Sequence, residues 1–166
     1  MFRHALLGSL LVAVLSTQYS ILTTSAHSAA PAASPDYTQT SWHTKLVDLH
    51  NAARAPLGVA PLAANPLLAQ AAQAHANHMA TSGQFSHSGI GDGDVTSRVS
   101  AAGYKASRWG ENIAWGPASA AGAQEVWMNS PPHREQLLSG DFQEVGFGAC
   151  KASDGKVYWV ACFGSP

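Results

Sequence analysis

VGFGACKASDGKVYWVACF, the sequence at residues 145–163, predicts a β-hairpin. Val145–Cys150 and Val157–Phe163 have the composition of strands, and Asp154-Gly155 between them is a turn dipeptide. Helical patterns fill most of the chain before this hairpin. Helices that precede and separate short strands indicate an α+β fold, in which the helices pack over a small, mainly antiparallel sheet.

The hairpin also carries both cysteines of the chain, Cys150 and Cys162. The first 26 residues, described below, resemble an export signal. Because an exported protein folds in an oxidising compartment, where two cysteines pair by default, we expect a Cys150–Cys162 disulfide. The pairing depends on the turn. If Asp154-Gly155 alone forms it, the two sulfurs are three residues out of register, about 10 Å apart along the strand. Because bridged Cα atoms lie within ~7 Å, the disulfide requires a wider turn centred near Lys156.

Upstream of the hairpin, apolar spacing and capping residues predict several helices. The second is the best delimited, with Asn65 as N-cap, Pro66 at the first helical position and Gly83 at its end. In the helix over 119–129 we expect Val126 and Trp127 to face inward. The remaining predicted elements are helices over 42–53, 94–103 and 130–140 and a short strand over 112–115.

The first 26 residues have the pattern of an export signal: a weakly positive start, an apolar run from Ala5 to Leu15, and small residues before the expected cleavage after Ala26. That run is shorter than the ~20 apolar residues that span a bilayer, so we expect secretion to the extracellular space without a stable membrane span, with an uncleaved anchor as the alternative. An Ala-, Ser- and Pro-rich leader is predicted over 27–40, followed by one domain over 41–166.

Composition narrows the class of partner. Only 11% of residues are charged, and the 9 Lys and Arg are spread along the chain rather than clustered. A nucleic-acid-binding protein needs a basic face to neutralise phosphates, so nucleic acid is excluded as a partner. We expect a monomer.

Histidines are the most conspicuous candidate site residues. His75 and His78 lie three apart on the second predicted helix, but His75 falls on the apolar face, which favours a core histidine, and His78 points sideways toward solvent. His87, Glu111 and His133 are 24 and 22 residues apart, which matches no local metal-binding spacing. Glu111 lies in apolar surroundings, where a carboxylate needs a partner.

Five short sequence blocks follow one another along the chain: Leu49–Arg54, Phe85–Ser88, Gly110–Ala114, Trp127 with Ser130–Arg134, and Phe142–Gly148. In this order they resemble the CAP superfamily, also called SCP. This family includes cysteine-rich secretory proteins, venom allergens and plant pathogenesis-related proteins, and the present sequence is similar to its short microbial members. The resemblance covers about residues 43–164 and implies a three-layer α-β-α sandwich.

The resemblance also implies a cavity formed by His87, Glu111 and His133, in which His87 and His133 bind Zn²⁺ or another divalent cation. Ser130 stands where many family members carry a second glutamate. With fewer anionic ligands the cation is expected to bind weakly, and less so below about pH 6.5, where histidine becomes protonated.

Three functions fit this set of residues. The first is a non-enzymatic binding module for a lipid, a sterol, another small apolar ligand or an extracellular partner. The second is a metal-assisted hydrolase or protease with Glu111 as base; Ser86 and Ser88 flank His87, but the sequence contains no Gly-x-Ser-x-Gly motif. In the third, His87, Glu111 and His133 form a hydrogen-bonded cluster that only stabilises the fold.

Overall fold

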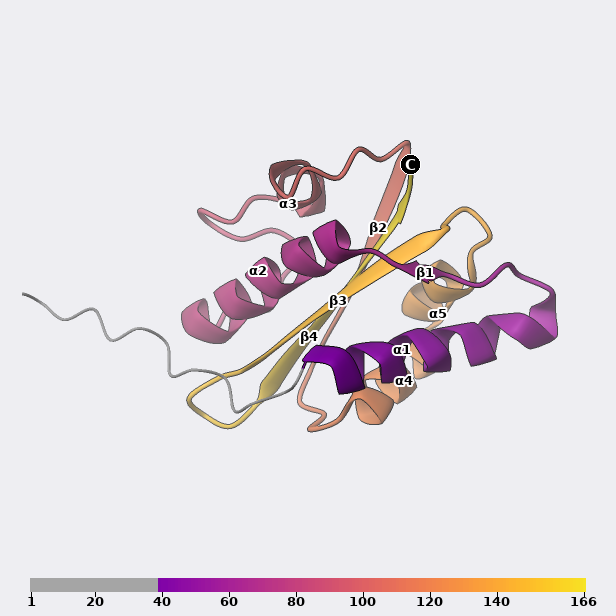
Figure 1. Cartoon of the computed structure of the whole chain (residues 1–166). Coiled ribbons are helices and arrows are strands. Elements are labelled where there is room, and N and C mark those ends of the chain that lie inside the picture. Colours follow the sequence, from indigo (N-terminus) through magenta and orange to yellow (C-terminus); the bar gives the residue numbers. More distant parts are fainter. Residues whose placement is uncertain (1–38) are drawn as a thin grey trace, which may run out of the picture.

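The computed structural model describes residues 39–166 (Figure 1). The predicted signal peptide and most of the predicted leader fall on residues 1–38, outside the described residues. In the described part, the elements in chain order are α1 (Gln39–Arg54), a 3-10 turn (Ala55–Leu57), β1 (Ala63–Ala64), α2 (Pro66–Ser82), α3 (Val95–Ala101), β2 (Arg108–Trp115), α4 (Ala120–Asn129), α5 (Pro131–Leu138), β3 (Glu144–Lys151) and β4 (Val157–Ser165).

The four strands form one sheet in the order β1-β3-β4-β2. β4 pairs antiparallel with both β3 and β2, whereas the two-residue β1 runs parallel to β3. Every residue of β4 is buried, as a strand covered on both faces requires. The sheet therefore has two edges: β2 forms one, and β3 with the short β1 forms the other.

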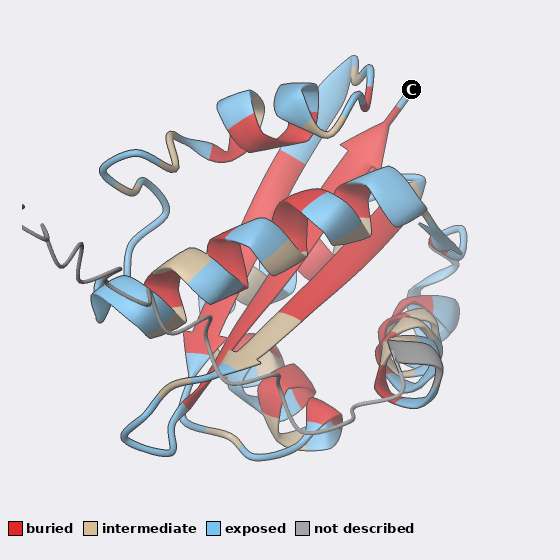
Figure 2. Ribbon diagram, turned by 60° about the vertical axis from the view of Figure 1, so that its left-hand side comes forward, coloured by how far each residue is buried: buried red, intermediate tan, exposed pale blue. Residues whose placement is uncertain are grey.

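Helices cover both faces of this sheet (Figures 1 and 2). On one face α2 and α3 pack against the strands through a core that includes Leu68, Met79 and Val160. On the other face α1, α4 and α5 enclose a larger core that includes Trp127 and Phe147. This arrangement confirms the predicted α+β fold and its three α-β-α layers.

Two glycines of β3 let α2 lie directly on the sheet. A Cβ atom at Gly146 would come within 2.0 Å of the Ala69 amide nitrogen, and one at Gly148 within 2.3 Å of the Ala72 carbonyl carbon. No side chain fits in that space, so the Gly-x-Gly spacing of β3 sets how closely the helix and the strand approach.

The ends of α2 agree with the sequence. Asn65 Oδ1 accepts hydrogen bonds from the backbone of Leu67 and Leu68, and Gly83 ends the helix in the left-handed region with φ of 71°. In α4 the prediction was half right: Trp127 is fully buried, but Val126 is 40% exposed. The short strand predicted over 112–115 is in fact longer and begins at Arg108.

The register of the hairpin overturns the predicted disulfide. Cys150 lies opposite Tyr158, and Cys162 lies opposite Gly146. The two cysteines are thus four residues apart along the sheet, about 13 Å, which is beyond bridging distance. The turn closes between Ala152 and Lys156, so it is centred two residues before Lys156. Cys162 is a buried thiol.

Within residues 39–166, every helix is too short or too polar to span a bilayer.

Candidate functional site

The structure brings His87 and Glu111 into direct contact at the β2 edge of the sheet. His87 lies in the loop that follows α2, and Glu111 projects from the middle of β2. The Nδ1 atom of His87 is 2.9 Å from Oε1 of Glu111. The Glu111 side chain is 2% exposed and that of His87 is 54% exposed, so a buried carboxylate orients an imidazole whose other side faces solvent.

Arg98, on α3, forms a hydrogen bond with the second carboxylate oxygen of Glu111. Its Nη2 atom donates to Glu111 Oε2 over 2.6 Å and also to the backbone oxygen of His87 over 3.2 Å. Its Nη1 atom donates to Asp92 Oδ2 over 3.1 Å and to Gly93 O over 2.7 Å. Arg98 is itself buried, and it ties the loop carrying His87 and Asp92 to the sheet.

His75 supports the same loop from α2. Its Nδ1 atom is 2.5 Å from Asp92 Oδ2, and its Nε2 atom is 2.8 Å from the backbone oxygen of Ser86. The ring is fully buried, which confirms the prediction of a core histidine with satisfied nitrogens. His78 is half-buried, and its Nε2 atom is shielded from solvent, so the prediction that it points toward solvent was wrong.

His133, on α5, approaches the site from the other face of the sheet. Asn112 of β2 donates to its backbone oxygen over 2.8 Å, which fixes the start of α5 beside the strand. Burial lowers the pKa of His133, and the nearby positive charge of protonated His87 lowers it further. Within residues 39–166, no hydrogen bond joins the His133 ring to His87 or Glu111, and its Nδ1 atom is buried without a partner.

These contacts limit the chemistry of the site. Both carboxylate oxygens of Glu111 are held, one by His87 and one by Arg98, so Glu111 is poorly placed to ligate a cation or to take a proton from water. Among the described residues, no three His, Cys, Asp or Glu side chains are grouped to hold a metal ion. Nor does any serine hydroxyl in that part of the chain bond to His87; Ser86 Oγ accepts instead from the amide of Ser88.

Sequence reasoning missed Arg98 and Asp92. The signal for Arg98 was available, because it lies three residues after Val95 and one before Val99, on the apolar face of α3. A buried cation on an apolar face requires an anionic partner, and the buried carboxylate of Glu111 likewise requires a cationic one. Asp92 lies in a glycine-rich loop, where no periodicity reveals which side is inward.

Comparisons with known proteins agree with this architecture. A family model described as CAP, the cysteine-rich secretory protein family, matches residues 47–163. The membrane protein YlbC of Bacillus subtilis is 32% identical over 110 residues, which is 66% of this chain and 32% of YlbC. This chain therefore covers about a third of that relative's length.

Solved structures with a similar fold include those of two bacterial proteins. An extracellular protein containing an SCP domain from Bacillus anthracis is 27% identical with a TM-score of 0.68, over 75% of this chain and 40% of that one. An outer surface protein of Borrelia burgdorferi is 21% identical with a TM-score of 0.67, over 74% of this chain and 90% of that one. At that identity the Borrelia protein supports the fold alone.

Proposed function

Because this chain belongs to the cysteine-rich secretory protein (CAP) family, we propose that it is a secreted, non-catalytic binding domain whose site is the pair of imidazoles of His87 and His133. Extracellular placement is supported by the export signal predicted at the amino terminus and by the extracellular SCP-domain protein of Bacillus anthracis. The relatives' whole-protein activities do not transfer, since this chain matches only part of YlbC.

The proposal of a binding role rests on the hydrogen bonds made by both carboxylate oxygens of Glu111. A general base needs a carboxylate oxygen within hydrogen-bond reach of the proton that it removes. Here the ion pair with Arg98 and the hydrogen bond from His87 occupy the two oxygens, and the side chain is 2% exposed. Glu111 is therefore a positioning residue for His87, and the group presented outward is an imidazole.

The donor set fits a weakly bound divalent cation. A carboxylate bonded to one ring nitrogen of a histidine fixes the ring and leaves the other nitrogen for a metal, the usual arrangement around metal-binding histidines. His87 has this support from Glu111. His133 supplies the second imidazole, and its lowered pKa keeps it neutral and able to ligate at neutral pH. Two imidazoles fall short of the three protein ligands of catalytic zinc sites, which favours binding over hydrolysis. When bound, the cation supplies a positive charge that an anionic group of a partner can pair with.

Zinc titration tests this proposal. Isothermal titration of the secreted chain at pH 7.5 should show one weak site, which His87→Ala and His133→Ala each weaken by about tenfold or more. His43→Ala removes an imidazole at the opposite edge of the sheet and should leave the affinity unchanged. Because the His87 side chain is 54% exposed but gives the buried Glu111 one hydrogen bond, His87→Ala should reduce stability by only about 1 kcal/mol and lower the melting temperature slightly.

Three results would overturn the proposal. Zinc binding that survives in both site variants would place the cation elsewhere. A large fall in melting temperature in His87→Ala without any zinc binding by the wild type would favour the purely structural cluster. Hydrolysis of a peptide or ester by the wild type that His87→Ala abolishes would favour the hydrolase.

A further inference from the structure

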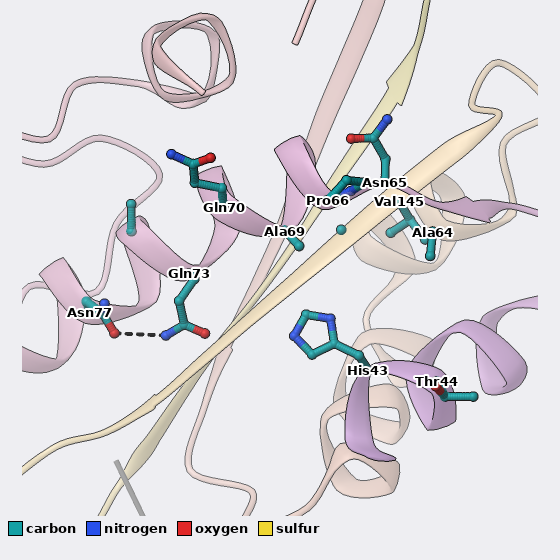
Figure 3. A pocket seen from close by; sticks show the side chains of 12 residues that line it. His43, Thr44, Ala64, Asn65, Pro66, Ala69, Gln70, Gln73, Asn77 and Val145 are labelled. Carbon is teal, nitrogen blue, oxygen red and sulfur yellow. Dashed lines mark hydrogen bonds between the residues drawn. The ribbon is translucent and has the colours of Figure 1, made fainter. Parts of the chain in front are cut away.

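A cavity lies at the opposite edge of the sheet from His87. It is a groove of about 740 Å³ between the start of α1 and α2, with β1 and β3 beneath it (Figure 3). Its volume falls in the range of ligand-binding pockets. Since β2 and β3 lie on opposite sides of β4, this groove is separate from the imidazole site.

The groove is lined without a single charge. None of its twelve lining residues is Asp, Glu, Lys or Arg. Its one histidine, His43, has a pKa lowered by burial, which favours the neutral ring. An ionised ligand would lose hydration here without gaining a partner, so the occupant that matches this lining is uncharged.

On the wall formed by α2, the side chain of Gln73 hydrogen-bonds to a peptide group of β3. Gln73 donates from Nε2 to Ala149 O over 2.8 Å and accepts at Oε1 from Ala149 N over 3.2 Å. Its carboxamide thus pairs with β3 as a peptide group of a neighbouring strand would. The neighbouring strand itself, β1, reaches only Glu144 and Val145. Past those two residues, β3 has no strand on this side in the described part of the chain.

The α2 wall keeps a polar group that a ligand can reach. Asn77 accepts from Gln73 through Oδ1 over 2.8 Å, which leaves its amide nitrogen without a hydrogen bond within residues 39–166. Asn77 is exposed, so this amide can donate to a molecule in the groove. On the other wall, the ring of His43 reaches toward β3 (Figure 3).

We propose that this groove binds a short, extended, uncharged segment of a polypeptide. The carboxamides of Gln70 and Asn77 provide donors and acceptors for its backbone, and the small residues Ala64, Ala69 and Ala74 leave room for its side chains. The mode is strand addition at a sheet edge, confined to the stretch between β1 and Gln73. This site is independent of the cation site proposed above.

β1 provides a matched pair of variants. Ala64 lines the groove and Ala63 does not, yet both are exposed. Because successive side chains of a strand point to opposite sides, Ala64→Phe fills the groove while Ala63→Phe adds the same bulk outside it. Asn77→Ala is a milder variant that removes only the amide.

The probe is acetyl-tetraalanine amide, titrated into the ¹⁵N-labelled secreted chain and followed by NMR. We expect amide shifts at the groove residues, an affinity at least about tenfold weaker in Ala64→Phe, within about twofold of wild type in Ala63→Phe, and several-fold weaker in Asn77→Ala. An N-acetylglucosamine tetramer and octyl glucoside serve as comparison probes.

Each remaining outcome overturns the proposal. Absence of peptide-induced shifts, or shifts at the β2 edge, would show that the groove does not bind peptide. Binding retained in both Ala64→Phe and Asn77→Ala would place the peptide elsewhere. Groove shifts caused by the sugar or the alkyl chain but not by the peptide would assign the groove to another ligand class.

Discussion

Replacing Arg98 with Met should lower the free energy of unfolding by about 3 kcal/mol. Arg98 and Glu111 form an ion pair of 2.6 Å in which the two side chains are only 3% and 2% exposed. Removing one partner of a buried pair costs about 3–5 kcal/mol, because the other charge stays buried without compensation. We expect the lower end of this range, since Glu111 keeps its hydrogen bond from His87 and Asp92 keeps His75.

Urea unfolding at pH 7 measures this loss. With an m-value of about 1.5 kcal/mol/M, a loss of about 3 kcal/mol lowers the unfolding midpoint by about 2 M. Arg108→Met is the control, because Arg108 and Asp141 also form an ion pair, at 2.9 Å, but with side chains 65% and 57% exposed. Exposed pairs contribute less than about 1 kcal/mol.

A double variant, Arg98→Met with Glu111→Leu, removes both charges and should recover part of the lost stability, since no ion is then left uncompensated. If Arg98→Met loses no more stability than Arg108→Met, the network is not a buried ionic unit, and the assignment of Glu111 as a positioning residue fails with it.

Two other substitutions test the fold. Gly148→Ala should cost about 3 kcal/mol or prevent folding, since its Cβ would lie 2.3 Å from backbone atoms of α2, whereas Gly140→Ala, with nothing within 4 Å, should stay within about 0.5 kcal/mol of wild type in thermal denaturation. His50 tests pH dependence: burial lowers its pKa to about 3, so the unfolded chain binds a proton that the folded one does not as pH falls below 6.5. The stability that His50 contributes is therefore full above that pH and declines by about 1.4 kcal/mol per unit well below it. Between pH 6.5 and 4.5 the free energy of unfolding should fall by about 2 kcal/mol more in wild type than in His50→Leu; equal losses would mean that His50 is not the group responsible.

The fold was predictable wherever local rules decide structure. Asn65, Pro66 and Gly83 delimit α2 because capping and backbone conformation depend on neighbouring residues alone. The register of the β3–β4 hairpin was less accessible, because the residues 152–156 allow more than one turn. The expected disulfide required a turn centred near Lys156. In the structure the turn instead closes with the hydrogen bond from Ala152 N to Lys156 O.

The sequence named candidate site residues, but it could not show how their side chains are connected. The order of the sequence blocks singled out His87, Glu111 and His133, yet it could not show that both carboxylate oxygens of Glu111 would be hydrogen-bonded. That depends on Arg98, which α3 brings beside β2 from thirteen residues away in the chain. The guanidinium of Arg98 forms an ion pair with Glu111 and also donates to the backbone oxygen of His87. Glu111 therefore helps to fix the loop that carries His87. The ring of His87 is 54% exposed, and for this reason we propose a binding role for the site rather than a catalytic one.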